Sequence, residues 1–376
     1  MVNPGSPLTV AIEKCSLYNL QTVRRSLIQL LDRLGGIKSL VSPGQNVLLK
    51  PNLLSAASPV EAVSTHPVVM QAMAEIVTEA GGNVYLGDSP GSDSQEKAMQ
   101  VCGMKEVIER TGAEYLTFSD NTGVEVNNYK KRIIPIASTL AQMDLIINMG
   151  KLKTHAFTGM TGGVKNVFGC VVGARKARFH LDYPLPLDFS RLLIDVYLAV
   201  KPSFTILDAV IAMEGAGPRR GRPRQVGLLA ASPCAVALDR VAAEITGFYP
   251  EEVTTLVAAR ELGLPGTKLS EVRFEGMSLE EARVPGFDKG PAAGGKLSRL
   301  MVLFPVARVR DMLSARRPYP KVNPELCTVC AVCRDNCPAQ VVKIKDAFPV
   351  IDYRGCIRCY CCQEFCAYGA IDLARK

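Results

Sequence analysis

Eight cysteines near the carboxyl end of the chain stand at the spacing of ligands for metal clusters. The pattern C-x2-C-x2-C-x3-C occurs twice. Three thiolates on one tight loop reach three irons of a cube, and the x3 step carries the fourth cysteine toward the other run. The repeat therefore predicts two [4Fe–4S] clusters. The expected ligand sets are Cys327, Cys330, Cys333 and Cys366 for one cluster, and Cys356, Cys359, Cys362 and Cys337 for the other.

A pair of zinc sites is the alternative for these cysteines. Zinc sites made of four cysteines usually use two well-separated pairs, which the duplicated order does not resemble. Cys361 is an extra thiol beside Cys362 and is predicted not to be a ligand, and Ala367 stands where the first run has Pro338. Two neighbouring clusters suit a relay of single electrons, with a purely structural role as the alternative.

Polar motifs follow several candidate strands in the first 220 residues. They are Lys50-Pro51-Asn52, the segment 87–91, the segment 151–166, and Asp208 with the segment 214–218. Ligands bind at the carboxyl ends of the strands in an open parallel sheet. The predicted substrate-binding residues are Lys50, Asn52, Ser89, Lys151, Thr154, Gly162, Gly163, Asn166 and His180.

The third motif combines lysines with a glycine-rich turn that is predicted to open a helix. Exposed amides at a helix N-terminus together with lysines make an anion site, so a phosphate or carboxylate is the expected ligand. The segment is neither a Walker A loop nor a G-x-G-x-x-G motif, and plain turn chemistry is the alternative. The predicted catalytic residues are His155, Lys153, Lys165 and Asp88.

Two of these residues have other interpretations that the sequence leaves open. A histidine such as His155 titrates near neutral pH and suits general acid–base chemistry. Asp88 is an acid, a metal ligand or a turn former in Asp-Ser-Pro-Gly. His66, which precedes Pro67, is interpreted as a helix cap rather than a site residue.

Short apolar runs alternate with amphipathic stretches along the first 260 residues. The expected strands are Leu8–Glu13, Asn46–Lys50, Asn83–Gly87, Leu145–Met149, Phe204–Val210 and Val226–Ala230, and the expected helices are Leu20–Leu34, Pro67–Ala80 and Glu96–Thr111. This alternation predicts an α/β domain with a mostly parallel sheet flanked by helices. We expect this domain to span residues 1–264. A linker and docking segment over 265–319, with a basic helix over Leu297–Arg317, then leads to a small α+β domain like a bacterial ferredoxin over 320–376.

Composition excludes some classes of protein. No apolar run approaches the 18 or so residues of a membrane span, and the first residues lack the pattern of a signal peptide, so we expect a cytoplasmic protein. The net charge of +8 comes partly from arginine runs at 219–224 and 308–317, interpreted as solvated loops and a linker. An anionic substrate or an acidic redox partner is the alternative, and no motif for nucleic acid accompanies the charge.

The polar motifs together resemble a known family. Lys50-Pro51-Asn52, Gly87 to Pro90, Lys151 to His155, and Lys165-Asn166 with Gly169 and His180 are similar to the domain of unknown function 362 family over about residues 45–250. Members often carry a ferredoxin domain at the carboxyl end, and the resemblance implies no substrate.

Three functions follow as hypotheses. The first is an oxidoreductase that takes electrons from a donor protein and passes them to an anionic substrate or to an organic cofactor that no fingerprint identifies. The second is an electron carrier or complex subunit without catalysis. The third is a non-redox enzyme with structural clusters.

Overall fold

The computed structural model describes residues 8–91, 93–173, 175–290 and 317–374. Within these residues, nine strands form the main sheet. In spatial order its path runs through β11 (Val272–Gly276), β1 (Leu8–Lys14), β10 (Arg220–Ser232), β9 (Phe204–Ala216), β7 (Leu145–His155), β2 (Asn46–Lys50), β3 (Asn83–Leu86) and β4 (Glu114–Tyr115), and β8 (Gly159–Thr161) pairs with β7. All neighbours on the path are parallel except β10, which runs antiparallel to β1 and β9. The expected mostly parallel sheet is confirmed.

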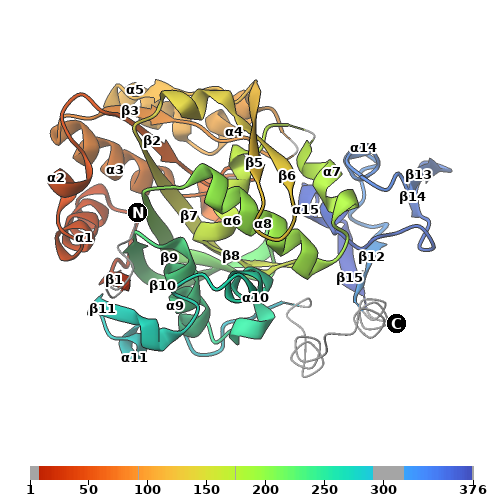
Figure 1. Ribbon diagram of the computed structural model, residues 1–376. Coiled ribbons are helices and arrows are strands. Elements are labelled where there is room, and N and C mark those ends of the chain that lie inside the picture. Colours follow the sequence, from red (N-terminus) through yellow and green to blue (C-terminus); the bar gives the residue numbers. More distant parts are fainter. Residues whose placement is uncertain (1–7, 92, 174, 291–316, 375–376) are drawn as a thin grey trace.

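Helices cover both faces of this sheet (Figure 1). They are α1 (Leu20–Arg33), α2 (Ile37–Leu40), α3 (Pro67–Glu79), α4 (Gln95–Val101), α5 (Met104–Thr111), α6 (Gly163–Asn166), α7 (Arg175–Asp182), α8 (Pro186–Val200), α9 (Ala235–Ile245), α10 (Thr254–Glu261) and α11 (Leu279–Ala282). A hairpin of β5 (Asn121–Val126) and β6 (Arg132–Ala137) lies beside α8.

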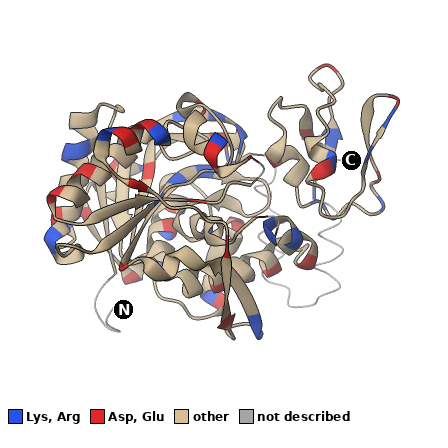
Figure 2. Cartoon of the chain, turned by 90° about the horizontal axis from the view of Figure 1, so that it is seen from above, with Lys and Arg blue, Asp and Glu red and all other residues tan. Residues whose placement is uncertain are grey.

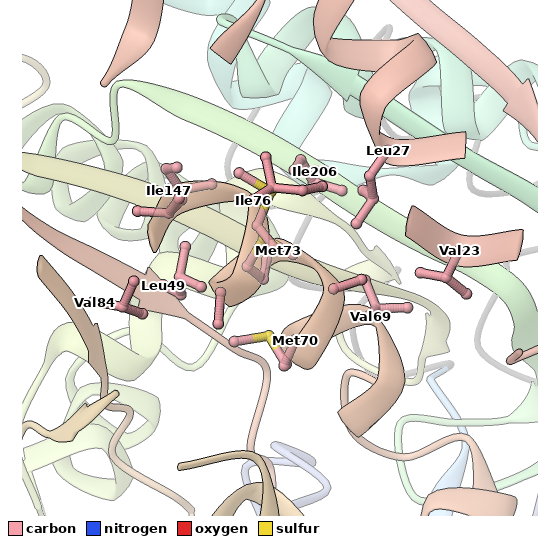
Figure 3. Close-up of a cluster of buried hydrophobic side chains, with 14 of the residues drawn as sticks. Val23, Leu27, Leu49, Val69, Met70, Met73, Ile76, Val84, Ile147 and Ile206 are labelled. Carbon is pink, nitrogen blue, oxygen red and sulfur yellow. The ribbon is translucent and has the colours of Figure 1, made fainter. Parts of the chain in front are cut away.

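The strands are apolar on both sides because each side meets helices. Leu49, Ile147 and Ile206 pack with α1 and α3 residues such as Leu27 and Met73 (Figure 3). The residues next to them in the strands point to the opposite face of the sheet. Leu48 and Ile146 join a second cluster with α8, and Leu207 joins a third with α9 and α10. Side chains of a strand point to opposite faces in turn, so near-continuous apolar runs indicate burial on both faces.

The carboxyl-terminal part of the described chain forms two small sheets and two short helices. β12 (Tyr319–Val322) pairs with β15 (Ile371–Ala374), and β13 (Val342–Lys345) pairs with β14 (Phe348–Ile351). The helices are α14 (Val332–Asp335) and α15 (Cys361–Phe365). In Figure 1 this segment, in blue, lies at one side of the sheet, with α15 facing the larger part and the β13–β14 hairpin pointing away.

Several expectations about local structure are corrected. The stretch Glu96–Thr111 is two helices, because Gly103 takes a left-handed conformation (φ 76°) between α4 and α5. The arginines at 219–224 are not in solvated loops: they begin strand β10 or directly precede it, and Arg222 pairs with Glu214 and Asp288. His66 does cap α3, since its ring nitrogen accepts from Val68 N at 3.3 Å.

Two more expectations concern the whole chain. Most of the predicted helix Leu297–Arg317 lies outside the described residues, as do the arginines of that segment up to Arg316. Within the part of the chain that the structure describes, no helix has the length and apolar character needed to cross a bilayer. Lys and Arg are interspersed with Asp and Glu along the described chain (Figure 2).

Candidate functional site

The polar motifs meet at the carboxyl edge of the parallel strands. Lys50 is the last residue of β2, Asp88 lies just beyond β3, and Lys153 lies in the second half of β7. The segment Lys151–His155 therefore belongs to the strand rather than following it, and all of its side chains are buried. The structure brings Lys50, Asn52, Asp88, Lys153 and Asn166 into one connected network.

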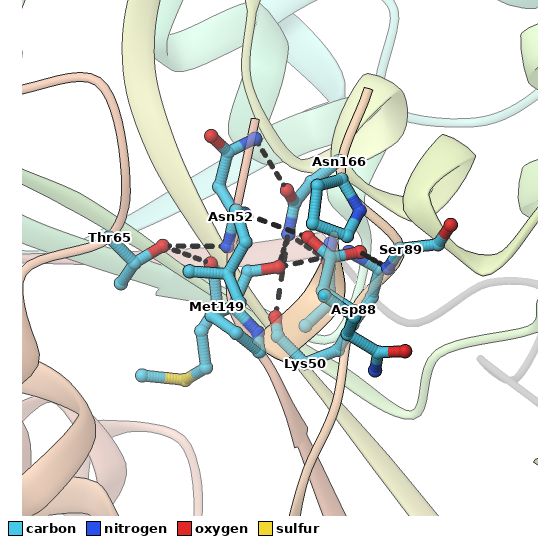
Figure 4. A network of polar contacts seen from close by, with 12 residues as sticks. Lys50, Asn52, Thr65, Asp88, Ser89, Met149 and Asn166 are labelled. Atoms are coloured by element: carbon cyan, nitrogen blue, oxygen red, sulfur yellow. Dashed lines mark hydrogen bonds and ion pairs between the residues drawn. The ribbon is translucent and has the colours of Figure 1, made fainter. Parts of the chain in front are cut away.

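A buried ion pair lies at the centre of this network (Figure 4). Lys50 Nζ donates to Asp88 Oδ1 at 2.8 Å, and the two side chains are 0% and 4% exposed. Asp88 also accepts from Leu53 N at 2.8 Å and Ser89 N at 2.9 Å. Gly169 is needed here, because a Cβ on it would lie 1.9 Å from Asp88 Oδ1. The carboxylate is therefore held in place on three sides.

A chain of amide hydrogen bonds extends from this pair. Lys153 Nζ donates to Asn52 Oδ1, Asn52 Nδ2 donates to Asn166 Oδ1, and Asn166 Nδ2 donates to Asn148 Oδ1, each at 2.8 Å. Burial lowers the pKa of Lys153 to about 7, with the charge of Lys165 as the next cause. Asn148 was not predicted as a site residue, because it stands inside an apolar strand without any motif.

The glycine-rich turn is filled by a carboxylate of the chain itself. Asp239 of α9 accepts from Gly163 N at 2.5 Å and Val164 N at 3.0 Å. A Cβ on Gly162 would lie 2.1 Å from Asp239 Oδ1. Burial raises the pKa of Asp239 to about 7. The structure thus differs from the expected exposed amides: α6 is only four residues long, and its first two amides already have an acceptor.

Lys151 and Thr154 are engaged elsewhere. Lys151 Nζ donates to Asp208 Oδ2 at 2.9 Å and to Tyr18 OH at 2.7 Å, and the ring of Tyr18 stacks on His66. Thr154 Oγ1 accepts from Gly217 N at 3.1 Å. Both side chains have internal partners, so they do not join the network around Asp88.

A cavity of about 70 Å³ opens beside the network. Its polar lining includes Asp88, Ser89, Lys165, Lys176, His180 and, from α15, Glu364. Lys176 donates to Ser89 Oγ and Pro90 O, both at 2.9 Å, and burial lowers its pKa to about 8. Lys176 and His180 share one face of α7 because they are four residues apart. The sequence alone did not predict Lys176 as a site residue.

His155 lies between the network and α15. Its Nδ1 accepts from Phe157 N at 3.0 Å and from Thr158 N at 3.3 Å, which assigns the proton to Nε2. Nε2 has no hydrogen-bond partner among the described residues and lies 3.6 Å from Glu364 Oε2. Burial, followed by the charge of Lys165, holds the pKa of His155 well below its usual range, so the ring is neutral.

The eight cysteines of the repeat line two further cavities. One is bordered by Cys327, Cys330, Cys333 and Cys366, and the other by Cys337, Cys356, Cys359 and Cys362. These are the two crossed sets expected for clusters, so the residues present fit that cofactor. Among the described side chains, no group of three or more His, Cys, Asp or Glu is arranged to hold a single metal ion. Cys361 is buried next to Cys362 and lines neither cavity.

The backbone repeats along with the cysteines. Val329 and Ala331 have left-handed φ values of 55° and 61°, and Arg358 and Tyr360, at the matching positions of the second run, have 53° and 65°. Ala331 and Tyr360 each precede a short helix, α14 and α15. Such conformations are costly for residues other than glycine and cluster at functional sites. Both runs therefore fold into the same strained loop.

The cysteine repeat contacts the site directly. Gln363 Nε2 donates to Ala216 O at 3.2 Å, and Arg220 pairs with Asp372 at 3.0 Å. Phe365 packs so closely on Gly91 that a Cβ there would lie 2.5 Å from its ring. Together with Glu364, these contacts place α15 over the carboxyl edge of the sheet.

Comparison with known proteins identifies relatives of the larger part. A family model described as a domain of unknown function, DUF362, matches residues 47–244. The thylakoid-associated protein sll1697 of Synechocystis sp. is 38% identical over 268 residues, which are 69% of this chain and 81% of that protein.

Two solved structures are distantly similar. The lactate racemase apoprotein from Thermoanaerobacterium thermosaccharolyticum has a TM-score of 0.40 at 12% identity, over 62% of this chain and 56% of that one. A structural genomics target from Thermotoga maritima has a TM-score of 0.36 at 15% identity, over 56% of this chain and 55% of that one. The chain thus spans little more than half of each structure, and similarities of this size carry no argument about function.

Proposed function

Since the chain belongs to the DUF362 family, whose description assigns no activity, we propose a function from its own residues. It is an iron–sulfur oxidoreductase that passes electrons through two [4Fe–4S] clusters to an anionic substrate or cofactor at the carboxyl edge of the α/β part. The observation that carries this proposal is the position of α15. This helix holds Cys362 of one cysteine-lined cavity, and its last two residues, Glu364 and Phe365, line the cavity beside Lys165.

The proposed clusters are supported by spacing and by geometry. The two crossed sets of four cysteines each border one cavity, and the repeated left-handed loops carry them. When bound, each cluster supplies a site that takes up or releases one electron. We assign the clusters to a ferredoxin-type domain over 320–376, joined by a linker over 265–319 to the α/β domain over 1–264.

The chain's own residues have distinct proposed roles at the cavity. Lys165 binds the anion, and Asn52, Lys153 and Asn166 form a fixed wall behind it through their hydrogen bonds. His155 Nε2 carries a proton at the α15 side and is the candidate for proton transfer. Asp88 accepts three hydrogen bonds, which favours a role in holding Lys50 over one in moving protons.

The electron donor is proposed to be another redox protein, and the location is proposed to be cytoplasmic. An organic cofactor remains part of the proposal, because a redox enzyme needs an electron acceptor. Mass spectrometry of small molecules that co-purify with the chain would identify it.

Reoxidation of the reduced protein tests the proposal. The protein is purified without oxygen, reduced with dithionite and mixed with small carboxylate and phosphate compounds or with oxidised ferredoxin. Reoxidation by a small molecule, lost in Cys337→Ser and kept in Cys361→Ser, is the expected result. Turnover that survives loss of the clusters in folded protein would instead favour a non-redox enzyme.

A non-catalytic electron carrier is the second candidate. It is favoured by the fact that the ammonium groups of Lys50, Lys151 and Lys153 all have internal partners, which leaves them less free to bind substrate. Reoxidation by a protein partner, with no response to any small molecule, would establish this function instead.

A further inference from the structure

The cavity beside α15 is lined by more lysines than unpaired carboxylates, and burial lowers the pKa of one of them, Lys165. Asp88 is neutralised by Lys50, at 2.8 Å. The remaining charged groups of the lining are Lys165 and Lys176 against the single carboxylate of Glu364. Lys165 makes no hydrogen bond or ion pair within the described part of the chain, whereas Lys176 donates to Ser89 and Pro90. One lysine of the cavity is therefore left to bind something else.

His180 supplies a second group without a partner. It is 7% exposed, lines the cavity, and has no hydrogen-bond partner for its Nδ1 atom among the residues that the structure describes. Its ring stacks on Phe189 with the centroids 4.1 Å apart, which fixes its plane. Burial, followed by the charge of Lys165, lowers its pKa to about 3, so the ring is neutral and has one N–H to donate. Leaving a buried polar atom unpaired is costly, and a ligand in the cavity would remove that cost.

Glu364 is the only carboxylate that α15 places in the lining. Its carboxylate lies 3.6 Å from His155 and makes no shorter polar contact with the described part of the chain. Its charge acts on both Lys153 and Lys165. A carboxylate in this position resembles an anionic ligand that the chain supplies to its own site.

We propose that this cavity is a binding site for a small oxyanion, held by Lys165 and His180, and that Glu364 is the counterion which the ligand replaces. A volume of about 70 Å³ exceeds the roughly 10–15 Å³ that one water needs, so it has room for a ligand of a few non-hydrogen atoms. A short carboxylate and a tetrahedral oxoanion share the required chemistry. The anion site itself does not depend on the proposed function. Only the further step, that the bound anion is the substrate, rests on it.

Calorimetric titration of the full chain with acetate and with inorganic phosphate tests the site. Lys165→Met keeps the length of the side chain without its charge and is expected to weaken binding at least about tenfold, the effect of about 1.4 kcal/mol. Lys105→Met, an exposed lysine of α5 outside the lining, is the matched control and should bind as the wild type does. Tighter binding of acetate would indicate a carboxylate ligand, and tighter binding of phosphate would indicate a tetrahedral oxoanion.

Three further variants separate binding from folding. His180→Phe keeps the stacked ring and removes the N–H, so it should weaken binding, and His180→Gln, which retains an N–H, should restore part of it. Glu364→Gln removes the competing charge and should tighten binding about tenfold, an effect that a purely structural residue would not produce. Unchanged binding in Lys165→Met, weaker binding in Glu364→Gln, or no binding of either anion would overturn the inference.

Iron and sulfide content of the same samples reports on the proposed function separately. A chain without iron that still binds acetate through Lys165 would contradict the oxidoreductase and leave the anion site. A chain that contains both clusters but binds the anions equally well in Lys165→Met would contradict the anion site and leave the oxidoreductase.

Discussion

Nε2 of His155 lies 3.6 Å from Oε2 of Glu364, so strand β7 and helix α15 meet at one point. The strand carries the buried segment Lys151–His155, and the helix carries Cys362 of the repeat. The cavity is lined by residues that lie far apart in the sequence, from Asn52 to Phe365. This relationship gives the cysteine repeat a place in the site as well as a proposed cofactor.

The Lys50–Asp88 pair should matter for stability. Lys50→Met leaves the buried carboxylate of Asp88 without its counterion, and breaking such a pair typically costs about 3–5 kcal/mol. Urea unfolding at pH 7 measures the loss. Lys97→Met is the control, because its pair with Asp93 is 65% exposed on the lysine side and should contribute less than about 1 kcal/mol. Equal, small losses in the two variants would contradict this account of the network.

Gly169 should tolerate no side chain. In Gly169→Ala the new Cβ would lie 1.9 Å from Asp88 Oδ1 and 2.8 Å from Lys50 Nζ, so the ion pair must shift. We expect a lower unfolding midpoint in urea. Gly123→Ala in β5 is the control, because its Cβ meets only the exposed side chain of Ile133. A Gly169 variant as stable as the Gly123 variant would show that the close approach is unimportant.

The crossed ligand sets predict the effect of single cysteine changes. Cys366→Ser should remove the cluster on Cys327, Cys330 and Cys333, and Cys337→Ser should remove the other, so each variant retains about four irons of eight. Cys361→Ser should retain all of them. Iron analysis together with electron paramagnetic resonance of the reduced protein measures this. Loss of iron in Cys361→Ser, with full iron in Cys337→Ser, would contradict the assignment.

His180 should make the fold sensitive to acid. Burial lowers its folded-state pKa to about 3, below the usual value near 6.5, so the unfolded chain binds the proton more readily. Stability attributable to His180 is therefore complete above about pH 6.5 and falls as the pH drops toward 3. At pH 5 the loss is about 2 kcal/mol. Urea unfolding of His180→Phe should show a shallower fall between pH 7 and pH 5, and an unchanged fall would refute the buried neutral ring.

Much of the sheet was predictable from its apolar runs. Strand Asn46–Lys50 has the predicted bounds, and the strands at Leu8, Asn83, Leu145 and Phe204 begin where expected. The ends of β7 and β9 were not predicted, because their second halves carry buried polar residues such as Lys153 and Glu214. Both side chains have partners that are distant in the sequence: Lys153 donates to Asn52, and Glu214 accepts from Asp288 N.

The site was predictable only where residues form a motif. The cysteine spacing led to the same two sets of four that border the two cavities. Asp239 and Glu364 had no such signal, since a lone carboxylate in a helix is usually a solvated side chain. Asp239 meets Gly163, and Glu364 meets His155, only once the chain has folded.

The most direct test of the central claim is the iron and acid-labile sulfide content of the chain purified without oxygen. Two cubane clusters predict about eight irons and about eight sulfides per chain, with spectra of [4Fe–4S] centres after reduction. About two zinc ions per chain and no sulfide would contradict the account, because the same cysteines would then hold single metal ions.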